Sequence, residues 1–212
     1  MKLTIVLTFL VAFATAAQAV EPLPRSTPLR ISLPQSIALE RQYPSLADCE
    51  ALQDAYHRAG WPRGSGVEVL RTIDARVKRQ MILRHDRGGD RWTPLAAQIL
   101  RRERPAGDCD EISITAAQLA VCAGVPARNI GLMITDAPDG NPGEMHMVAF
   151  FRDGAGRNWV FGDSFGPVRP LSHLREEVFY FANLTDVGNW FGMMAKVNPR
   201  SGSARTATAS TP

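Results

Sequence analysis

The stretch "GDCDEISI", residues 107–114, sets one cysteine among three carboxylates at the start of an apolar, periodic segment. Asp108 is a residue type that commonly precedes a helix as its N-cap. Apolar residues then recur on one helical face, at Ile112, Ala116, Leu119 and Ala120. Gly124 ends the pattern. The spacing predicts a helix over 109–123, with Cys109 at its N-terminus and toward its buried side.

Cys109 has a conflicting electrostatic setting. Its neighbours Asp108, Asp110 and Glu111 are negatively charged and raise the pKa of a thiol, whereas a nucleophile needs that pKa lowered. Unsatisfied N–H groups at a helix N-terminus act in the opposite direction, because they favour the thiolate and can also hold an oxyanion. The thiol is therefore either a bystander or a nucleophile with a positive charge close by.

The helix is followed by a change of period from helical to alternating. Strands are predicted over 129–135, 145–151 and 158–165. The segment "RDGAGR" is predicted to be the hairpin turn between the last two strands. Further helices are predicted over 46–59, 67–83, 94–100 and 171–184. Helices followed by an antiparallel sheet indicate an α+β fold.

Two polar residues of these strands complete a catalytic pattern. His146 lies in the second strand and Asp163 at the end of the third. If residues 153–156 form the turn, the two lie at corresponding ends of adjacent antiparallel strands. A cysteine hydrolase needs an ionisable thiol, a base and a group that orients the base, so we interpret Cys109, His146 and Asp163 in these roles. Taken singly, such a histidine is commonly a core residue and such an aspartate a turn residue.

Both ends of the chain are predicted to lie outside the folded domain, which we place at 46–197. Residues 1–19 read as a secretory signal peptide with an A-x-A site, cut after Ala19. The alternative is an uncleaved membrane anchor, although its apolar run is shorter than the roughly 20 residues of a membrane span. Residues 20–45 hold five prolines and are predicted to form an extended arm. The Ser/Thr-rich residues 198–212 are predicted to be a disordered tail.

Charge gives no argument for a nucleic-acid partner. The formal net charge is +3, and loss of the signal peptide with Lys2 lowers it by one, to +2. Basic residues are scattered, and the densest spot, Arg101–Arg102, reads as a solvated helix face. We therefore predict an exported protein that does not bind nucleic acid.

The mature chain keeps three cysteines, an odd number for an exported protein. Such a count indicates one free thiol and one bridge. If Cys109 is the free thiol, Cys49 and Cys122 are the pair that remains. The alternative is that these two are small buried apolar residues.

Five segments together carry a family resemblance. They are "RWTP" (91–94), "GDCDE" (107–111), "AGVPARNI" (123–130), "HMVAFF" (146–151) and "WVFGDSF" (159–165). In these the chain resembles the bacterial transglutaminase-like cysteine peptidases, within the papain-like and transglutaminase superfamily, over about 69–166. The resemblance implies a papain-like fold and a triad of Cys109, His146 and Asp163. It implies an exported, periplasmic peptidase that cleaves an amide bond in an envelope protein.

The same resemblance bears on partners and on a metal. Some members of the family are calcium-dependent proteases that clip large surface adhesins and so release cells from biofilms, which implies an adhesin substrate and a membrane-bound regulator. It implies Asp108, Asp110 and Glu111 as Ca²⁺ ligands. Because Ca²⁺ takes 6–8 oxygen ligands, backbone carbonyls or further acids would have to join them. The alternative is that Asp108 is only an N-cap and the other two only favour the helix dipole.

Three features of the sequence and two rival functions stay open. Ser164 stands where the family often has an amide, and 112–114 hold no aromatic residue where many members have one. Trp92 is interpreted as a packing residue, although in the superfamily a tryptophan indole can assist the oxyanion hole. One rival function is transglutaminase-type transfer to an amine. The other is a non-catalytic, calcium-responsive binding protein with the same fold.

Overall fold

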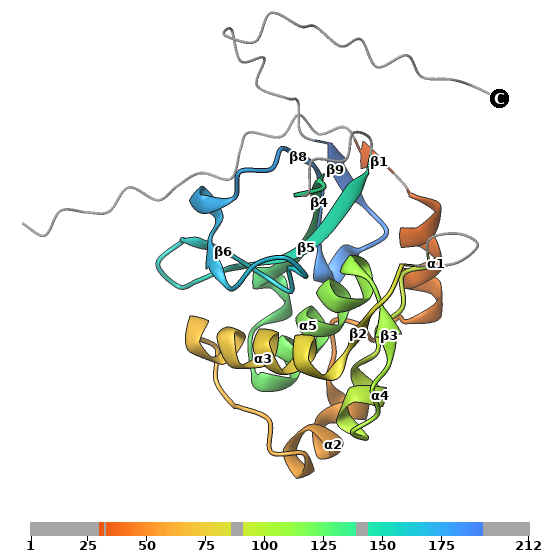
Figure 1. The fold of residues 1–212 in the computed structure, drawn as a ribbon, viewed down its shortest axis with the longest axis vertical. Helices are drawn as coiled ribbons and strands as arrows, with labels where there is room; N and C mark the ends of the chain where they lie inside the picture. Colours follow the sequence, from red (N-terminus) through yellow and green to blue (C-terminus); the bar gives the residue numbers. More distant parts are fainter. Residues whose placement is uncertain (1–29, 32, 86–90, 139–143, 193–212) are drawn as a thin grey trace, which may run out of the picture.

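Helices from the first half of the chain lie against an antiparallel sheet built mostly from the second half (Figure 1). The computed structural model describes residues 30–192 except residue 32 and the segments 86–90 and 139–143. The predicted signal peptide and the predicted tail lie outside the described residues. Within the described part, no helix combines the length and the apolar character needed to cross a bilayer.

The sheet has seven strands in the order β1-β9-β8-β4-β5-β6-β7, and every neighbouring pair is antiparallel. Their bounds are β1 Arg30–Ile31, β4 Ile130–Asp136, β5 Met145–Arg152, β6 Asn158–Phe161, β7 Arg169–Pro170, β8 Val178–Asn183 and β9 Trp190–Gly192. The central strands β4 and β5 are buried on both faces, which explains their nearly continuous apolar sequences. On one face their side chains join the main core, and on the other they form a smaller cluster around Val148 and Phe150.

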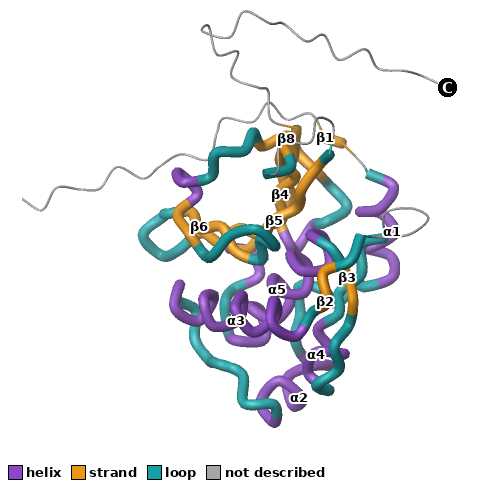
Figure 2. The backbone as a smooth tube through the Cα atoms, viewed as in Figure 1, coloured by secondary structure: helices purple, strands orange, loops and turns teal. Residues whose placement is uncertain are grey.

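The helices are gathered on one side of the sheet, apart from one that lies at the N-terminal edge (Figure 2). They are α1 Pro34–Gln42, α2 Gln53–Arg58, α3 Val67–Gln80, α4 Ala96–Leu100 and α5 Cys109–Ala123. A short parallel pair, β2 Ile82–Leu83 and β3 Ala106–Gly107, leads into α5. Along α5 every residue except Cys109 and Val121 is buried, because β5 lies on one side and α3 and α4 on the other. The helix predicted over 109–123 is therefore confirmed.

Several predicted boundaries and two predicted elements were wrong. The arm over 20–45 is not extended throughout, because Pro34–Gln42 form α1, with Pro34 in its first turn and Leu39 buried in the core. The segment 171–184 is not a helix: it is a short 3₁₀ turn followed by β8, which pairs with β4. The aromatic and branched run "VFYF" in β8 suits a strand wherever a neighbouring strand offers hydrogen bonds.

The other predicted helices and strands exist with shifted ends. The helix predicted over 46–59 begins as a 3₁₀ turn at Glu50, and the one predicted from 94 begins at Ala96. The helix predicted over 67–83 ends at Gln80, because the next residues pair with β3. The strand predicted over 158–165 ends at Phe161.

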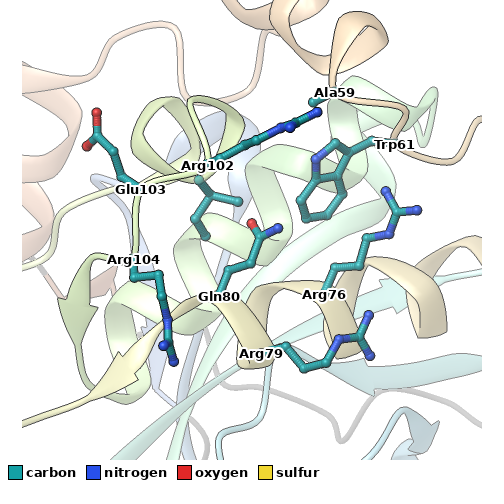
Figure 3. Close-up of a pocket in the computed structure, with 9 residues that line it drawn as sticks. Ala59, Trp61, Arg76, Arg79, Gln80, Arg102, Glu103 and Arg104 are labelled. Atoms are coloured by element: carbon teal, nitrogen blue, oxygen red, sulfur yellow. The ribbon is translucent and has the colours of Figure 1, made fainter.

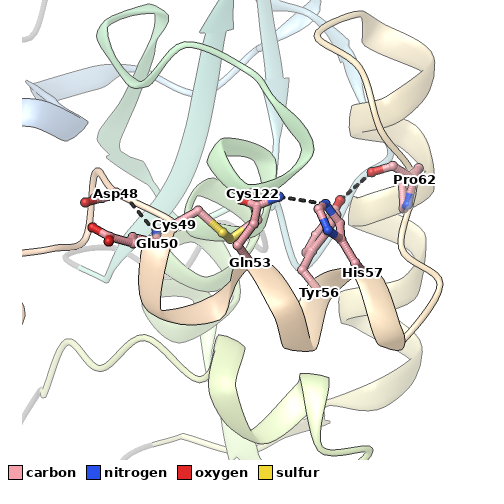
Figure 4. The surroundings of a disulfide bond; sticks show 8 residues. All are labelled: Asp48, Cys49, Glu50, Gln53, Tyr56, His57, Pro62 and Cys122. Carbon is pink, nitrogen blue, oxygen red and sulfur yellow. Dashed lines mark hydrogen bonds between the residues drawn. A yellow bond between two sulfur atoms is a disulfide. The ribbon is translucent and has the colours of Figure 1, made fainter.

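A disulfide joins Cys49, before α2, to Cys122, in the last turn of α5 (Figure 4). The predicted pairing is confirmed, and the alternative of two separate buried thiols is wrong. The bridge spans 73 residues, so the loop-entropy relation gives it about 4 kcal/mol of stabilisation. Cys109 lies outside the disulfide and is half-buried.

Candidate active site

The hairpin of β5 and β6 brings two of the predicted site residues into contact. The backbone N–H of Asp153 donates to the carbonyl of Arg157, so the hairpin turns where the sequence predicts it. Ala149 then pairs with Phe161, and His146 and Asp163 follow on the same end of the two strands. Nε2 of His146 lies 2.9 Å from Oδ1 of Asp163, and both side chains are buried.

Asp163 is held as a carboxylate by three donors. Besides His146, the backbone N–H of Phe165 donates to Oδ1 at 2.9 Å, and the guanidinium of Arg169 lies 2.6 Å from Oδ2. Burial raises the pKa of Asp163, but the hydrogen bonds from His146, Phe165 and Arg169 outweigh it and lower that pKa to about 2. An ionised Asp163 must accept the hydrogen bond, so His146 donates through Nε2. The proton-free nitrogen of the neutral imidazole is therefore Nδ1.

Ser113 links the segments that carry all three predicted residues. Its Oγ lies 2.7 Å from the carbonyl oxygen of Cys109 and 2.8 Å from the carbonyl oxygens of Met147 and Gly162. Met147 directly follows His146, and Gly162 directly precedes Asp163. The side chain is fully buried, so its single proton is shared among three carbonyls with no competition from water.

Gly162 fits against α5 only because it has no side chain. Its φ is +63°, and an added Cβ would lie 3.0 Å from the Cα of Ser113 and 3.2 Å from the Cβ of Ala116. The backbone N–H of Gly162 donates to the buried carboxylate of Asp74 on α3 at 2.8 Å. These contacts fix the backbone immediately before Asp163.

Asp74 also organises the far end of this loop. Its Oδ2 accepts from Nζ of Lys78 at 2.7 Å, and the same ammonium donates to the carbonyl of Gly166 at 2.5 Å. Burial raises the pKa of Asp74, although the hydrogen bond from Lys78 opposes the shift. One ion pair on α3, between the buried Asp74 and the partly buried Lys78, therefore holds both ends of the segment 162–166.

The acidic residues around the thiol divide into two groups. Asp108 and Glu111 form a capping box at the start of α5, in which Oε2 of Glu111 accepts from the backbone N–H of Asp108 at 3.0 Å. Within the described residues, Asp108, Cys109 and Asp110 form a cluster whose ligand atoms all lie within 4.8 Å of one another. The predicted conflict is therefore present: two carboxylates lie close to the thiol.

No protein-family model and no curated protein matches the sequence. Among solved structures, Legionella pneumophila LapG matches with a TM-score of 0.50 at 17% identity, covering 76% of this chain and 90% of LapG. Its calcium-bound form matches with a TM-score of 0.51 at 19% identity, covering 76% and 88%. Its EGTA-treated form gives 0.50 at 17% identity, covering 76% and 87%.

The chain has the LapG fold. This confirms the predicted α+β, transglutaminase-like class, with helices against an antiparallel sheet and the cysteine at a helix N-terminus. Because most of LapG is covered, the likeness concerns the whole domain and not a shared hairpin. At this identity the LapG likeness establishes the fold, and the roles of individual residues rest on the geometry above.

The structure also settles the packing of Trp92 and shows residues that the sequence analysis did not single out. Trp92 is buried against Trp190, with ring centroids 5.4 Å apart, as the packing interpretation predicts. The ring of Phe165 meets the imidazole of His146 edge-on at 5.2 Å and is itself 59% exposed. Sequence reasoning missed Ser113 as a link, although one polar residue between two isoleucines in a buried helix was a usable signal. Asp74, Lys78 and Arg169 gave no such signal.

Proposed function

We propose that this protein is a cysteine peptidase that hydrolyses an amide bond through Cys109, His146 and Asp163. The observation that carries the proposal is the buried His146–Asp163 pair, linked through Ser113 to the backbone of Cys109 at the start of α5. Nucleophilic catalysis needs a thiol, a base and a group that orients the base, and a buried, paired histidine on the strand that packs against the cysteine's helix supports that assignment.

The chemistry follows from the protonation state of each group. Asp163 stays ionised and binds Nε2–H, so Nδ1 of His146 takes the proton of the Cys109 thiol. The thiolate attacks the carbonyl carbon, and the imidazolium gives its proton to the leaving amine as the C–N bond breaks. Water then attacks the thioester while Nδ1 takes its proton, which releases the acid and restores the thiol. Backbone N–H groups at the start of α5 stabilise the oxyanion in both steps.

We further propose that Asp108 and Asp110 bind Ca²⁺, with Glu111 as the third acidic residue of the site. Carboxylate oxygens are the hard ligands that Ca²⁺ prefers, and LapG is known in a calcium-bound and an EGTA-treated form. A bound cation would offset the carboxylates that disfavour the thiolate. Asp108 and Glu111 also form the capping box of α5, so Asp110 is the one of the three carboxylates that is not shared with the helix cap.

The substrate that we propose is a protein of the periplasm or cell envelope, such as a surface adhesin. The signal-peptide pattern in 1–19 supports export. Beside the imidazole, the ring of Phe165 is 59% exposed, and it offers an apolar surface to a substrate side chain. A membrane-bound regulator stays a prediction.

The test is the rate of iodoacetamide alkylation of Cys109 against pH, mapped by peptide mass spectrometry, with Ca²⁺ and with EGTA. We expect rapid alkylation well below pH 8.5, slowed by His146→Ala and by EGTA. Reaction only near pH 8.5 in both buffers would favour the non-catalytic binding protein. A product carrying an added amine, found when protein substrates are incubated with a labelled amine, would favour transglutaminase-type transfer.

A further inference from the structure

Four arginines surround a pocket that shares no residue with the candidate active site. The pocket has a volume of about 380 Å³ and lies between α3, the end of α4 and the segment after α2 (Figure 3). Arg76 and Arg79 come from α3, and Arg102 and Arg104 from the loop after α4. Trp61 forms part of the wall and is buried. The sequence does not reveal this cluster, because the four arginines converge only in the fold.

The positive charge of this arginine pocket is largely uncompensated. Glu103 is the one acidic residue that lines it, but its carboxylate is paired with Arg101, outside the lining, at 2.7 Å. Across the described residues, Arg79, Arg102 and Arg104 form no ion pair. Guanidiniums present several donors in a fixed plane that matches carboxylate geometry. The pocket is therefore suited to an anionic ligand.

Arg102 holds a backbone conformation that favours glycine. Its φ is +63°, and it follows α4 in a motif in which Arg102 N–H donates to the carbonyl of Ile99 and Glu103 N–H to that of Gln98. Most helices that end this way have glycine at the position of Arg102. A side chain retained at a conformational cost indicates a function for that side chain.

Two further groups distinguish the kind of anion. Oε1 of Gln80 is buried and has no hydrogen-bond partner in the described structure, and Figure 3 shows its amide directed between Arg102 and Trp61. This acceptor needs an N–H or O–H donor, which a peptide backbone supplies and a fully ionised phosphate does not. Arg76 lies over the Trp61 ring, 5.3 Å from its centroid, and donates to the carbonyl of Gly60, so its planar guanidinium is held at the pocket wall as a flat group for a peptide plane.

We propose that the arginine pocket binds an acidic segment of a partner protein. Aspartate or glutamate carboxylates of that segment pair with Arg79, Arg102 and Arg104, while one of its backbone N–H groups donates to Gln80. The site is independent of the catalytic groups, so it can be occupied whether or not Cys109 is active.

The test is fluorescence anisotropy of a fluorescein-labelled dodecapeptide of alternating aspartate and glycine, titrated with the mature protein. A peptide with asparagine in place of aspartate is the ligand control. We expect the aspartate peptide to bind, and to bind at least tenfold more weakly when NaCl rises from 50 to 500 mM. Arg79→Glu with Arg104→Glu should weaken binding about tenfold or more, and Arg102→Gly by about threefold. Arg175→Glu, an exposed arginine outside the pocket, is the matched control.

The outcomes separate the proposal from its alternatives. A loss confined to the pocket variants, with thermal unfolding unchanged in Arg79→Glu/Arg104→Glu, would support an acidic-peptide site. An equal loss in Arg175→Glu would mean general charge attraction and would overturn the proposal. Displacement of the peptide by equimolar tripolyphosphate would also overturn it, because the pocket would then be a small-anion site. Alkylation of Cys109, measured on the same samples, reports on the proposed peptidase separately.

Discussion

The candidate active site and the arginine pocket differ in whether their charged side chains are paired within the protein. Both oxygens of Asp163 accept hydrogen bonds, and so do both oxygens of Asp74 behind it. In the pocket, three guanidiniums form no ion pair across the described residues, and Arg102 keeps a costly backbone conformation. Paired buried charges fix the geometry of a preorganised site, whereas unpaired charges remain available to a ligand. In this protein the paired carboxylates position the candidate catalytic groups, whereas the arginines without ion pairs remain available to a ligand.

The greatest change in alkylation rate is expected when the charge of Asp163 is removed. Asp163→Asn removes the carboxylate that stabilises an imidazolium, so the thiolate of Cys109 loses its partner. We expect the alkylation rate at pH 6.5 to fall about 100-fold, which corresponds to a thiol pKa returning to about 8.5. Asp153→Asn, at the other end of the same hairpin, is the control and should leave the rate within about twofold. Equal effects of the two changes would show that hairpin stability, and not the charge, supports the thiolate.

The pH dependence of the unfolding free energy tests the ionised state of Asp163 without relying on the reactivity of Cys109. The folded pKa of Asp163 is about 2, below its ordinary value near 4, so its contribution is complete above about pH 4 and is lost as the pH falls toward 2. That contribution is about 2.5 kcal/mol. Urea unfolding of the wild type and of Asp163→Asn should therefore give free energies that converge between pH 5 and pH 2.5. Parallel curves over that range would contradict the lowered pKa.

A third prediction concerns Ser113, which hydrogen-bonds to the backbone segments that carry the three candidate catalytic residues. Ser113→Ala leaves three buried carbonyls without their shared donor, and we expect a loss of about 2 kcal/mol in unfolding free energy. We also expect roughly tenfold slower alkylation of Cys109, because α5 can shift relative to β5 and β6. The control is Ser36→Ala, a fully buried serine that donates to one carbonyl, that of Leu33 just before α1, at 2.7 Å. It should lose about 1 kcal/mol with no change in alkylation.

The sequence could predict those parts of the site that depend on local pattern. The helix at Cys109 follows from an N-cap and apolar periodicity, and the meeting of His146 with Asp163 follows from a two-strand hairpin with a recognisable turn. Asp74 and Lys78 were beyond reach, because they bond to Gly162 and Gly166, each 88 residues away from its partner. No local pattern in α3 records such a contact.

The same reasoning explains where the fold prediction failed. Residues 178–183 carry both a helical spacing and strand-forming side chains, and the free edge of β4 decides between them. The N-terminal segment reads as extended from its prolines, yet Pro34 opens α1, where its missing N–H costs nothing. Tertiary partners decided both elements, and they are not visible in a single sequence.

The last and smallest effect tests whether Arg102 in the arginine pocket is retained for binding at a cost in stability. Arg102→Gly removes a Cβ from a position with φ of +63°, so the folded chain should become more stable by about 1 kcal/mol. For a domain of this size that raises the Tm by about 2–4 °C. Arg101→Gly is the matched control: Arg101 has φ of −80° and an ion pair with Glu103, so glycine there should lower the Tm. A rise in Tm together with weaker binding of the aspartate peptide would mean that Arg102 contributes to binding at a cost in stability. An unchanged Tm would remove the strain argument and leave the pocket to be judged on its charge alone.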